Sequence, residues 1–298
     1  MEDRPLVQWS FLQFKKTVKS SKAGASSLPT PSPCFLHSST QIGSKVLIYG
    51  GCDYFGEALN QLFIYDTENF QWSAPSGEES AFQEDQGGGR YGHSAVLVEM
   101  HPPKIMIYGG MIGGGTFEFD APDSVDDDRT PDQMERKFMM NRKRQGKRSA
   151  SLEEPDDSVY FLSLNADKWL WSKPLVQGSK ENKPLARCEH SAVKSGTNEV
   201  LIFGGWTHRP SNDMWTFNFV DMEWKPVTSS GIQPRSRYRH TAEVLGGGAS
   251  MFILGGSENG DDIPDGSRQL SIHELNLQTM SWSHPTLKGA YLSLVRLT

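Results

Sequence analysis

The sequence predicts an all-β fold made of four-stranded antiparallel sheets, and three observations support this. A histidine, an apolar run that ends in two glycines, a second apolar run and a tryptophan follow one another four times. The runs are short, rich in Val, Ile, Phe, Tyr and Leu, and bounded by turn-forming residues, which is typical of strands. Glycine is also frequent, with 29 in 298 residues, which indicates many turns. Because one small sheet cannot bury both of its faces, we expect the sheets to stack on one another.

The elements keep the same order in each repeat. The histidines that open the repeats are His37, His93, His190 and His240. The glycine pairs are Gly50-Gly51, Gly109-Gly110, Gly204-Gly205 and Gly255-Gly256. The tryptophans that close the repeats are Trp72, Trp171, Trp224 and Trp282. The period is about 50 to 60 residues, as in propellers of the kelch type, except that the second repeat contains a long insertion.

At these residues the chain resembles the kelch-repeat family of β-propellers, over about residues 34–284. The resemblance implies one blade for each repeat, at about 34–75, 90–174, 187–227 and 237–284. We expect each glycine pair to end a second strand where blades crowd or φ is positive. We expect each tryptophan to fill the space between blades. For the repeated histidine, a hydrogen bond to the backbone of a neighbouring blade is favoured over a metal ring near the axis.

The number of blades is left open by the sequence. Residues 1–33 form an N-terminal segment that includes a possible lone blade strand around Trp9, and residues 285–298 contain GAYLSLVRL, enough for one further strand. The ring is either four-bladed with terminal additions or an incomplete part of a longer propeller. We favour the incomplete ring, in which the outermost strand edges are exposed.

Composition excludes several classes of protein. The net charge of −6 makes general binding to nucleic acid or to an anionic membrane unexpected. The three cysteines have no metal-ligand spacing, and their odd number does not suggest a disulfide framework. The N-terminus has no signal-peptide pattern, and no run of 18 apolar residues occurs. We therefore expect an intracellular protein, in the cytoplasm, the nucleus or both.

The loops on one side of the predicted propeller are rich in arginine and aromatic residues, which are favoured at protein-binding hot spots. These loops join the second strand to the third, or lead into the next repeat. In kelch domains of ubiquitin-ligase adaptors, the family resemblance implies, this face captures short acidic peptides. An alternative is that some of these arginines brace blade junctions by binding carbonyl groups. Arg235 belongs to the same loops. The candidate partner-binding residues are Tyr54, Arg90, Tyr91, Arg187, Trp206, His208, Arg209, Arg237, Tyr238 and Arg239.

The insertion at residues 111–157 has few apolar residues and alternating acidic and basic blocks, so we expect it to be disordered. A solvated loop is one interpretation of its charges. A nuclear-localisation signal is the other, carried by Arg142, Lys143, Arg144, Lys147 and Arg148. Ser149 and Ser151 follow the basic run as basophilic kinase sites do, and a phosphate there would add about −1.5 to −2 charge.

We find no catalytic, phosphate-binding or metal-binding motif in the sequence. The primary prediction is a protein that is not an enzyme, needs no cofactor or metal, and serves as a protein-interaction module or scaffold. Its expected partner is a protein with an acidic or phosphorylated segment, as for a substrate-recognition adaptor. The alternative is a propeller enzyme, or a small-molecule or metal-binding protein that uses the axial channel. The sequence does not name the partner.

Overall fold

The computed structural model describes residues 30–53, 56–75, 88–113, 154–165, 168–179, 182–258 and 271–285. Within these ranges the protein consists of strands, turns and one short 3-10 helix, η4 (Gly246–Gly248). The strands form small antiparallel sheets, and the predicted all-β class is confirmed. The terminal strands expected around Trp9 and beyond Pro285 lie outside the described residues.

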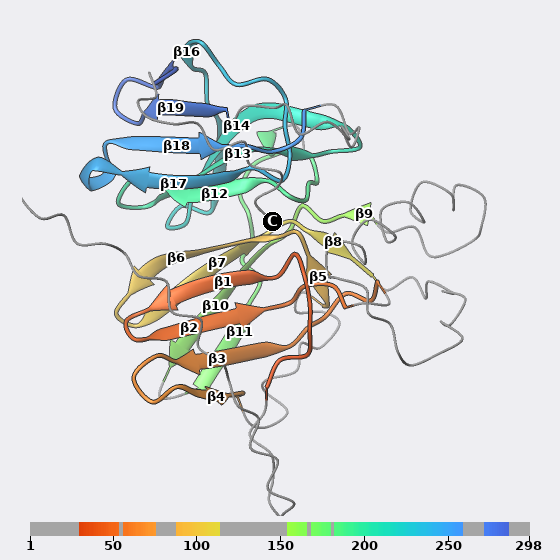
Figure 1. Cartoon of the computed structure of the whole chain (residues 1–298). Coiled ribbons are helices and arrows are strands. Elements are labelled where there is room, and N and C mark those ends of the chain that lie inside the picture. Colours follow the sequence, from red (N-terminus) through yellow and green to blue (C-terminus); the bar gives the residue numbers. More distant parts are fainter. Residues whose placement is uncertain are drawn as a thin grey trace, which may run out of the picture.

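Each of the four main sheets collects the strands of one repeat, and we call these sheets blades 1 to 4 (Figure 1). Blade 1 contains β1 (Ser38–Ile42), β2 (Lys45–Tyr49), β3 (Leu62–Asp66) and β4 (Gln71–Ser73). Blade 2 contains β6 (Ser94–Met100), β7 (Pro103–Tyr108), β10 (Val159–Asn165) and β11 (Lys168–Ser172). Blade 3 contains β12 (Ser191–Lys194), β13 (Glu199–Trp206), β14 (Pro210–Asn218) and β15 (Glu223–Pro226). Blade 4 contains β17 (Thr241–Leu245), β18 (Ser250–Leu254), β19 (Ile272–Asn276) and β20 (Ser281–Ser283).

The first strand of each blade is its inner strand. Strand β1 contacts β6, β6 contacts β12, and β12 contacts β17. In Figure 1 these strands follow one another across the middle of the molecule, and the later strands of each blade lie farther out. The described blades therefore form an arc, with blades 1 and 4 at its ends.

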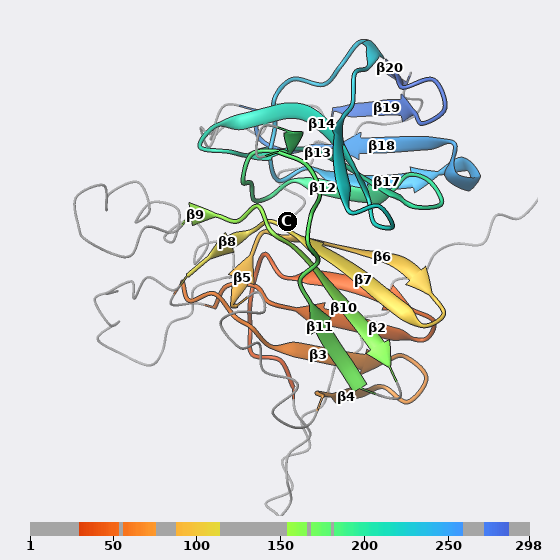
Figure 2. The same cartoon turned by 180° about the vertical axis from the view of Figure 1, so that it is seen from behind.

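Strand β13 shows why the blades stack. Val200, Leu201, Ile202 and Phe203 are all 0% exposed, although successive residues of a strand point to opposite faces of the sheet. Val200 and Ile202 join a cluster with residues of blade 2, whereas Leu201 and Phe203 join one with residues of blade 4. Both faces of blade 3 are thus covered by neighbours. Figure 2 shows the equivalent stacking of blade 2, with β10 and β11, over β2 and β3 of blade 1.

In blades 1, 3 and 4 the hairpin between the third and fourth strands uses one type of turn. Asp66 Oδ1 accepts hydrogen bonds from the backbone N–H groups of residues 68 and 69. Asn218 and Asn276 bind the N–H groups two and three residues later in the same way. Short polar side chains of this kind favour tight turns because they replace backbone partners.

Three short strands and one added strand complete the sheets. Strands β5 (Arg90–Tyr91), β8 (Met111–Ile112) and β9 (Glu154–Pro155) form a small sheet of their own. Strand β16 (Ser230–Gly231) pairs in parallel with β20. Because β8 and β9 pair antiparallel, the two ends of the charged insertion lie side by side. Residues 114–153 of that insertion lie outside the described residues.

Candidate functional site

A four-residue segment that ends in the repeat histidine forms the corner of every blade. These corner segments are residues 34–37, 90–93, 187–190 and 237–240. The third residue of each has a positive φ, and these residues are Leu36, Gly92, Glu189 and Arg239. In blades 2, 3 and 4 the backbone N–H of this residue donates to the carbonyl of the equivalent residue in the preceding blade, at 2.8, 2.6 and 2.9 Å. A chain of main-chain hydrogen bonds therefore links the corners of consecutive blades.

The arginines that open three of the corners are buried. Arg90, Arg187 and Arg237 are at most 1% exposed. One guanidinium nitrogen of each donates to the carbonyl of the first glycine in its own blade's glycine pair, at 2.7, 2.9 and 2.7 Å. Each also forms an ion pair, with Asp156 at 3.2 Å, Asp213 at 2.7 Å and Glu258 at 3.0 Å respectively.

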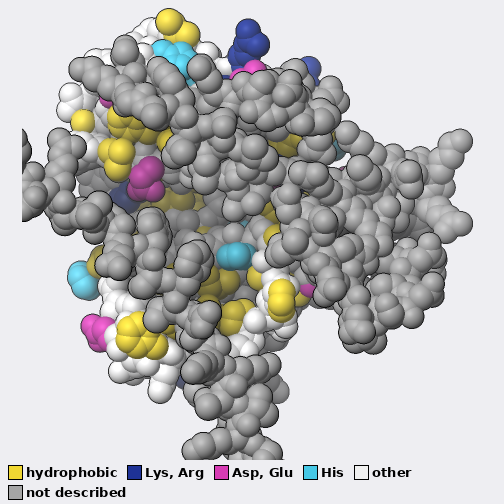
Figure 3. All heavy atoms as spheres, in the orientation of Figure 1, with side chains coloured by type: hydrophobic (Ala, Val, Ile, Leu, Met, Phe, Trp, Pro, Cys, Tyr) yellow, Lys and Arg dark blue, Asp and Glu magenta, His cyan; other side chains and the backbone are white. Residues whose placement is uncertain are grey.

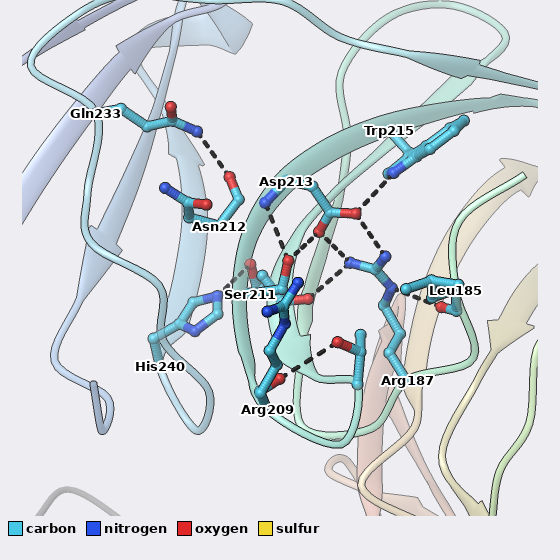
Figure 4. Close-up of polar contacts among 12 residues, drawn as sticks. Leu185, Arg187, Arg209, Ser211, Asn212, Asp213, Trp215, Gln233 and His240 are labelled. Atoms are coloured by element: carbon cyan, nitrogen blue, oxygen red, sulfur yellow. Dashed lines mark hydrogen bonds and ion pairs between the residues drawn. The ribbon is translucent and has the colours of Figure 1, made fainter. Parts of the chain in front are cut away.

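Figure 4 shows this arrangement in blade 3. The Arg187 guanidinium contacts both carboxylate oxygens of Asp213, at 2.7 and 2.8 Å. Ser211 Oγ donates to Oδ1 at 2.6 Å and Trp215 Nε1 donates to Oδ2 at 2.8 Å. Burial by itself raises the pKa of Asp213, but these hydrogen bonds and the charge of Arg187 outweigh it and lower the pKa to about 2. Asp213 is therefore ionised at neutral pH.

These contacts fit the bracing role that the sequence left open for Arg90, Arg187 and Arg237. Their charges are compensated inside the chain, so we do not assign them to a surface that a partner reaches. The sequence analysis missed the carboxylates that pair with them. Asp156, Asp213 and Glu258 have no constant spacing from their arginines, so no sequence pattern marks them.

The repeated histidines bind serine side chains of the preceding blade, rather than its backbone as expected. The Nε2 atoms of His93, His190 and His240 lie 2.8, 2.9 and 2.9 Å from the hydroxyl oxygens of Ser38, Ser94 and Ser191. Each serine directly follows the histidine of its own repeat, a His-Ser signal that is visible in the sequence. Burial lowers the pKa of all three histidines, in His240 to about 3. They are thus neutral structural groups.

An aromatic or apolar contact accompanies each of these hydrogen bonds. The ring of Tyr49 at the end of β2 contacts both His93 and Trp171 of blade 2, with centroids 5.1 Å apart in both pairs. Tyr108 makes the same two contacts with blade 3, and Phe203 makes them with blade 4. Trp171, Trp224 and Trp282 therefore lie between blades, as predicted. Trp72 does not, because it lies at the end of the arc, where its ring contacts Tyr65 of its own blade.

The glycine pairs are required by the same junctions. A Cβ at Gly109 would lie 2.5 Å from the carbonyl oxygen of Arg187 in the next blade. A Cβ at Gly110 would lie 2.8 Å from the Cβ of His93 in its own blade. Both glycines have positive φ, at 67° and 92°, which a residue with a side chain rarely adopts. Crowding and backbone conformation thus both select glycine, as predicted. The expectation that each pair ends its strand fails in blade 3, where β13 continues past Gly204-Gly205 to Trp206 with a register shift at the pair.

Four of the predicted partner-binding residues lie together with Arg235 at the junction of blades 3 and 4. His208 and Arg209 are exposed on the turn between β13 and β14, and the Arg235 side chain is 86% exposed. The ring of half-buried Trp206 lies 5.2 Å from the ring of Tyr238, which is buried at 8% exposure, in an edge-to-face contact. We call these five residues the blade 3–4 patch.

Backbone contacts hold the two segments of the patch together. The backbone N–H of Arg237 donates to the carbonyl of Ser211 at 2.8 Å, so Arg235 and Arg209 each lie two residues from this bond. The side chains of Gln233 and Asn212 add hydrogen bonds across the same two segments, at 2.7 and 3.3 Å (Figure 4). The position of the patch is therefore fixed by the fold.

The remaining predicted residues fall elsewhere. Arg239 is 17% exposed and pairs with Glu189 at 2.9 Å. Tyr91 is 0% exposed and packs in a small cluster with Cys52, Met111 and Cys188. Tyr54, the basic run Arg142, Lys143, Arg144, Lys147 and Arg148, and the serines Ser149 and Ser151 lie outside the described residues.

The described surface shows no other arrangement that suggests chemistry. On the face drawn in Figure 3, hydrophobic, acidic and basic side chains are intermixed. Among the described residues, no three His, Cys, Asp or Glu side chains are grouped as a metal ion would require. The same part of the chain contains no helix long and apolar enough to span a membrane.

Comparison with known proteins places these features in a family. The family model described as the KLHDC2/KLHL20/DRC7 Kelch-repeats domain matches residues 146–296, and the Kelch motif matches residues 33–76. Human host cell factor 2 is 25% identical over 274 residues, which are 85% of this chain and 29% of that protein. Drosophila melanogaster host cell factor is 21% identical over 86% of this chain and 16% of its own length.

A third relative matches a shorter part. Acyl-CoA-binding domain-containing protein 5 of Arabidopsis thaliana is 29% identical over 140 residues, 44% of this chain and 20% of that protein. The chain thus spans less than a third of the length of these three relatives. With its repeated corners, glycine pairs and interblade tryptophans, and with a family model that covers half of its residues, the chain belongs to the kelch-repeat family.

Proposed function

We propose that this chain is a non-catalytic protein-interaction module that binds an acidic or phosphorylated segment of a partner protein at the blade 3–4 patch. Membership of the kelch-repeat family supports an interaction function in general. The patch supports the location and the chemistry. In our proposal the chain acts inside the cell, as a scaffold or as a recognition adaptor.

The observation that carries the proposal is the contrast between two sets of arginines. Arg187 and Arg237 are buried and bind carboxylates of the chain itself. Arg209 is exposed, and Arg235 is exposed with only a long contact to Glu258, at 3.8 Å. Exposed guanidinium groups bind carboxylates or phosphates through two parallel hydrogen bonds. Of the arginines in these loops, Arg209 and Arg235 are therefore the two that a partner can reach most readily.

The aromatic pair supplies apolar contact beside the arginines. Trp206 is half-buried and its edge-to-face contact with Tyr238 holds its ring in place. A large ring that is already ordered loses little conformational entropy on binding. We expect a short segment with acidic residues on either side of an apolar or aromatic residue to fit best. Affinity should fall as salt rises, because the arginines are exposed to screening.

A direct test uses a fluorescein-labelled peptide of alternating glutamate and tyrosine, measured by fluorescence anisotropy, with a glutamine-for-glutamate peptide as the uncharged control. The double variant Arg209→Glu, Arg235→Glu should bind the acidic peptide at least about tenfold more weakly. The matched control is Lys45→Glu, Lys225→Glu, which changes the net charge equally at exposed lysines on β2 and β15, outside the patch. It should bind as the wild type does.

If the two double variants bind the peptide with equal affinity, the proposal is wrong. The peptide then binds at another site, or its binding depends only on the net charge of the protein. Both variants should have wild-type thermal unfolding, since all four side chains are exposed. Affinity capture from a cell lysate then identifies the proteins that the lysine control binds and the patch variant does not. If the captured proteins are the same for both, the patch does not bind the partner.

A further inference from the structure

The three junctions between blades repeat one set of contacts, so they define what each blade presents to its neighbours. Toward the preceding blade, a blade presents its corner histidine and the tryptophan of its fourth strand; we call this its leading face. Toward the following blade it presents three groups. These are the hydroxyl residue after the histidine, the second-strand side chain directly before the glycine pair, and the N–H of the second glycine. We call this its trailing face.

The junction of blades 3 and 4 illustrates the match. His240 Nε2 lies 2.9 Å from Ser191 Oγ, and the rings of Trp282 and Phe203 are 5.4 Å apart. The N–H of Gly205 donates to the carbonyl of residue 237 at 2.9 Å. The corresponding glycine N–H groups of blades 1 and 2 bind the corner carbonyls of residues 90 and 187, at 2.8 and 2.9 Å.

Blade 4 carries the same trailing face without a described blade against it. Its hydroxyl residue is Thr241, its second-strand residue is Leu254, and its second glycine is Gly256. Thr241 is exposed and Leu254 is half-buried. By contrast, the equivalent Ser191 and Phe203 of blade 3 are 8% and 0% exposed. The end blade therefore displays a surface that elsewhere in this chain is always covered by a blade.

Blade 1 carries the complementary leading face at the other end of the arc. Its corner histidine, His37, is exposed, whereas the other three are each 7% exposed. Its tryptophan, Trp72, is half-buried, as is Trp171, whereas Trp224 and Trp282 are each 3% exposed. Trp171 contacts Tyr49 of the preceding blade, whereas Trp72 has no described blade before it. Cys34 replaces the corner arginine, but this position contacts the preceding blade through its main-chain carbonyl, which cysteine also provides.

We propose that the trailing face of blade 4 binds the leading face of blade 1 of a second copy of this chain, head to tail. In that contact His37 Nε2 bonds Thr241 Oγ1, Trp72 packs on Leu254, and the Gly256 N–H donates to the carbonyl of residue 34. A second copy is the occupant because its end face repeats, position by position, what covers the trailing faces of blades 1 to 3. The interface joins two different surfaces, so two copies close a ring or further copies extend the chain.

The test is sedimentation velocity of the full chain over a range of concentrations. Wild type should associate as concentration rises. Thr241→Arg should block the trailing face and His37→Asp the leading face, and each should weaken self-association at least about tenfold. Thr279→Arg and His101→Asp are the matched controls, because both residues are exposed on hairpin turns. The controls should associate as the wild type does.

Mixing the two blocked variants provides the decisive result. The Thr241→Arg chain retains its leading face and the His37→Asp chain retains its trailing face, so an equimolar mixture should form a one-to-one dimer and nothing larger. A chain that stays monomeric at all concentrations overturns the proposal. So does association that neither variant weakens, or a mixture of the two variants that remains monomeric. Circular dichroism and thermal unfolding of each variant verify that it is folded.

Discussion

Lowering the pH from 7.5 to 5 should destabilise this protein through its buried corner histidines. His93, His190 and His240 are buried, and burial holds the pKa of each below its ordinary value, in His240 at about 3. In the unfolded chain a histidine has a pKa of about 6.5. Between these values the unfolded state binds a proton that the folded state does not. The stabilisation is therefore complete above pH 6.5 and is lost as the pH falls toward the folded pKa.

The size of the effect follows from the same linkage. At pH 5 each unfolded histidine is almost fully protonated, which lowers the free energy of unfolding by about 2 kcal/mol, or about 6 kcal/mol for the three together. Asp213 does not contribute in this range, because its folded pKa of about 2 matters only below pH 4. Such a loss is comparable to the whole stability of many domains.

Urea unfolding at pH 7.5, 6 and 5, followed by tryptophan fluorescence, measures this dependence. His190→Gln is the sharpest variant, because the glutamine amide nitrogen replaces Nε2 as the partner of Ser94 but does not titrate. The variant should lose about 2 kcal/mol less between pH 7.5 and 5 than the wild type. Equal free energies of unfolding of the wild type at the two pH values would refute the assignment of these histidines as buried and neutral.

Three further predictions concern the interblade tryptophans, the glycine pairs and the insertion. Trp224→Ala should lower the free energy of unfolding by about 3–5 kcal/mol, and Trp72→Ala, half-buried at the end of the arc, should cost clearly less; equal midpoints in urea would contradict this. Gly204→Ala should destabilise more than Gly178→Ala, because only at Gly204 would a Cβ lie 2.8 Å from the carbonyl oxygen of the next blade. Replacing residues 115–152 by a short Gly-Ser linker should leave a cooperatively unfolding protein, since Ile112 pairs with Glu154; aggregation of the product would contradict this.

The repeat could be predicted from the sequence because its signals are local. A glycine pair after an apolar run, or a tryptophan before serine, marks the same point of the blade each time, and the strands follow from short apolar runs between turn residues. The confirmed all-β class and the interblade position of Trp171, Trp224 and Trp282 rest on these signals. Each requires only a few consecutive residues.

The burial of the arginines could not be predicted in this way. Arginine in a Pro- or Gly-rich loop suggests an exposed cation, and nothing near Arg187 in sequence shows that Asp213 will neutralise it. That pair forms only when β14 places Asp213 beside the corner segment. The serine partners of the histidines are an intermediate case. The His-Ser pattern is visible, but only the stacking of blades shows that each histidine binds the serine of the preceding repeat.

Recurrence along the chain separates the residues that build this fold from those that can recognise a partner. Every blade packs against its neighbours in the same way. A residue type that recurs at one position in three or four repeats is therefore one that this packing requires. The corner arginines, histidines and glycine pairs all recur, and wherever a described blade precedes their own, the arginines and histidines are buried. Arg209 and Arg235 have no counterpart in the other repeats and are exposed. Nothing in the packing of the blades requires a cation at either position, and this is why the two arginines, rather than the recurring set, carry the proposed recognition of an acidic partner.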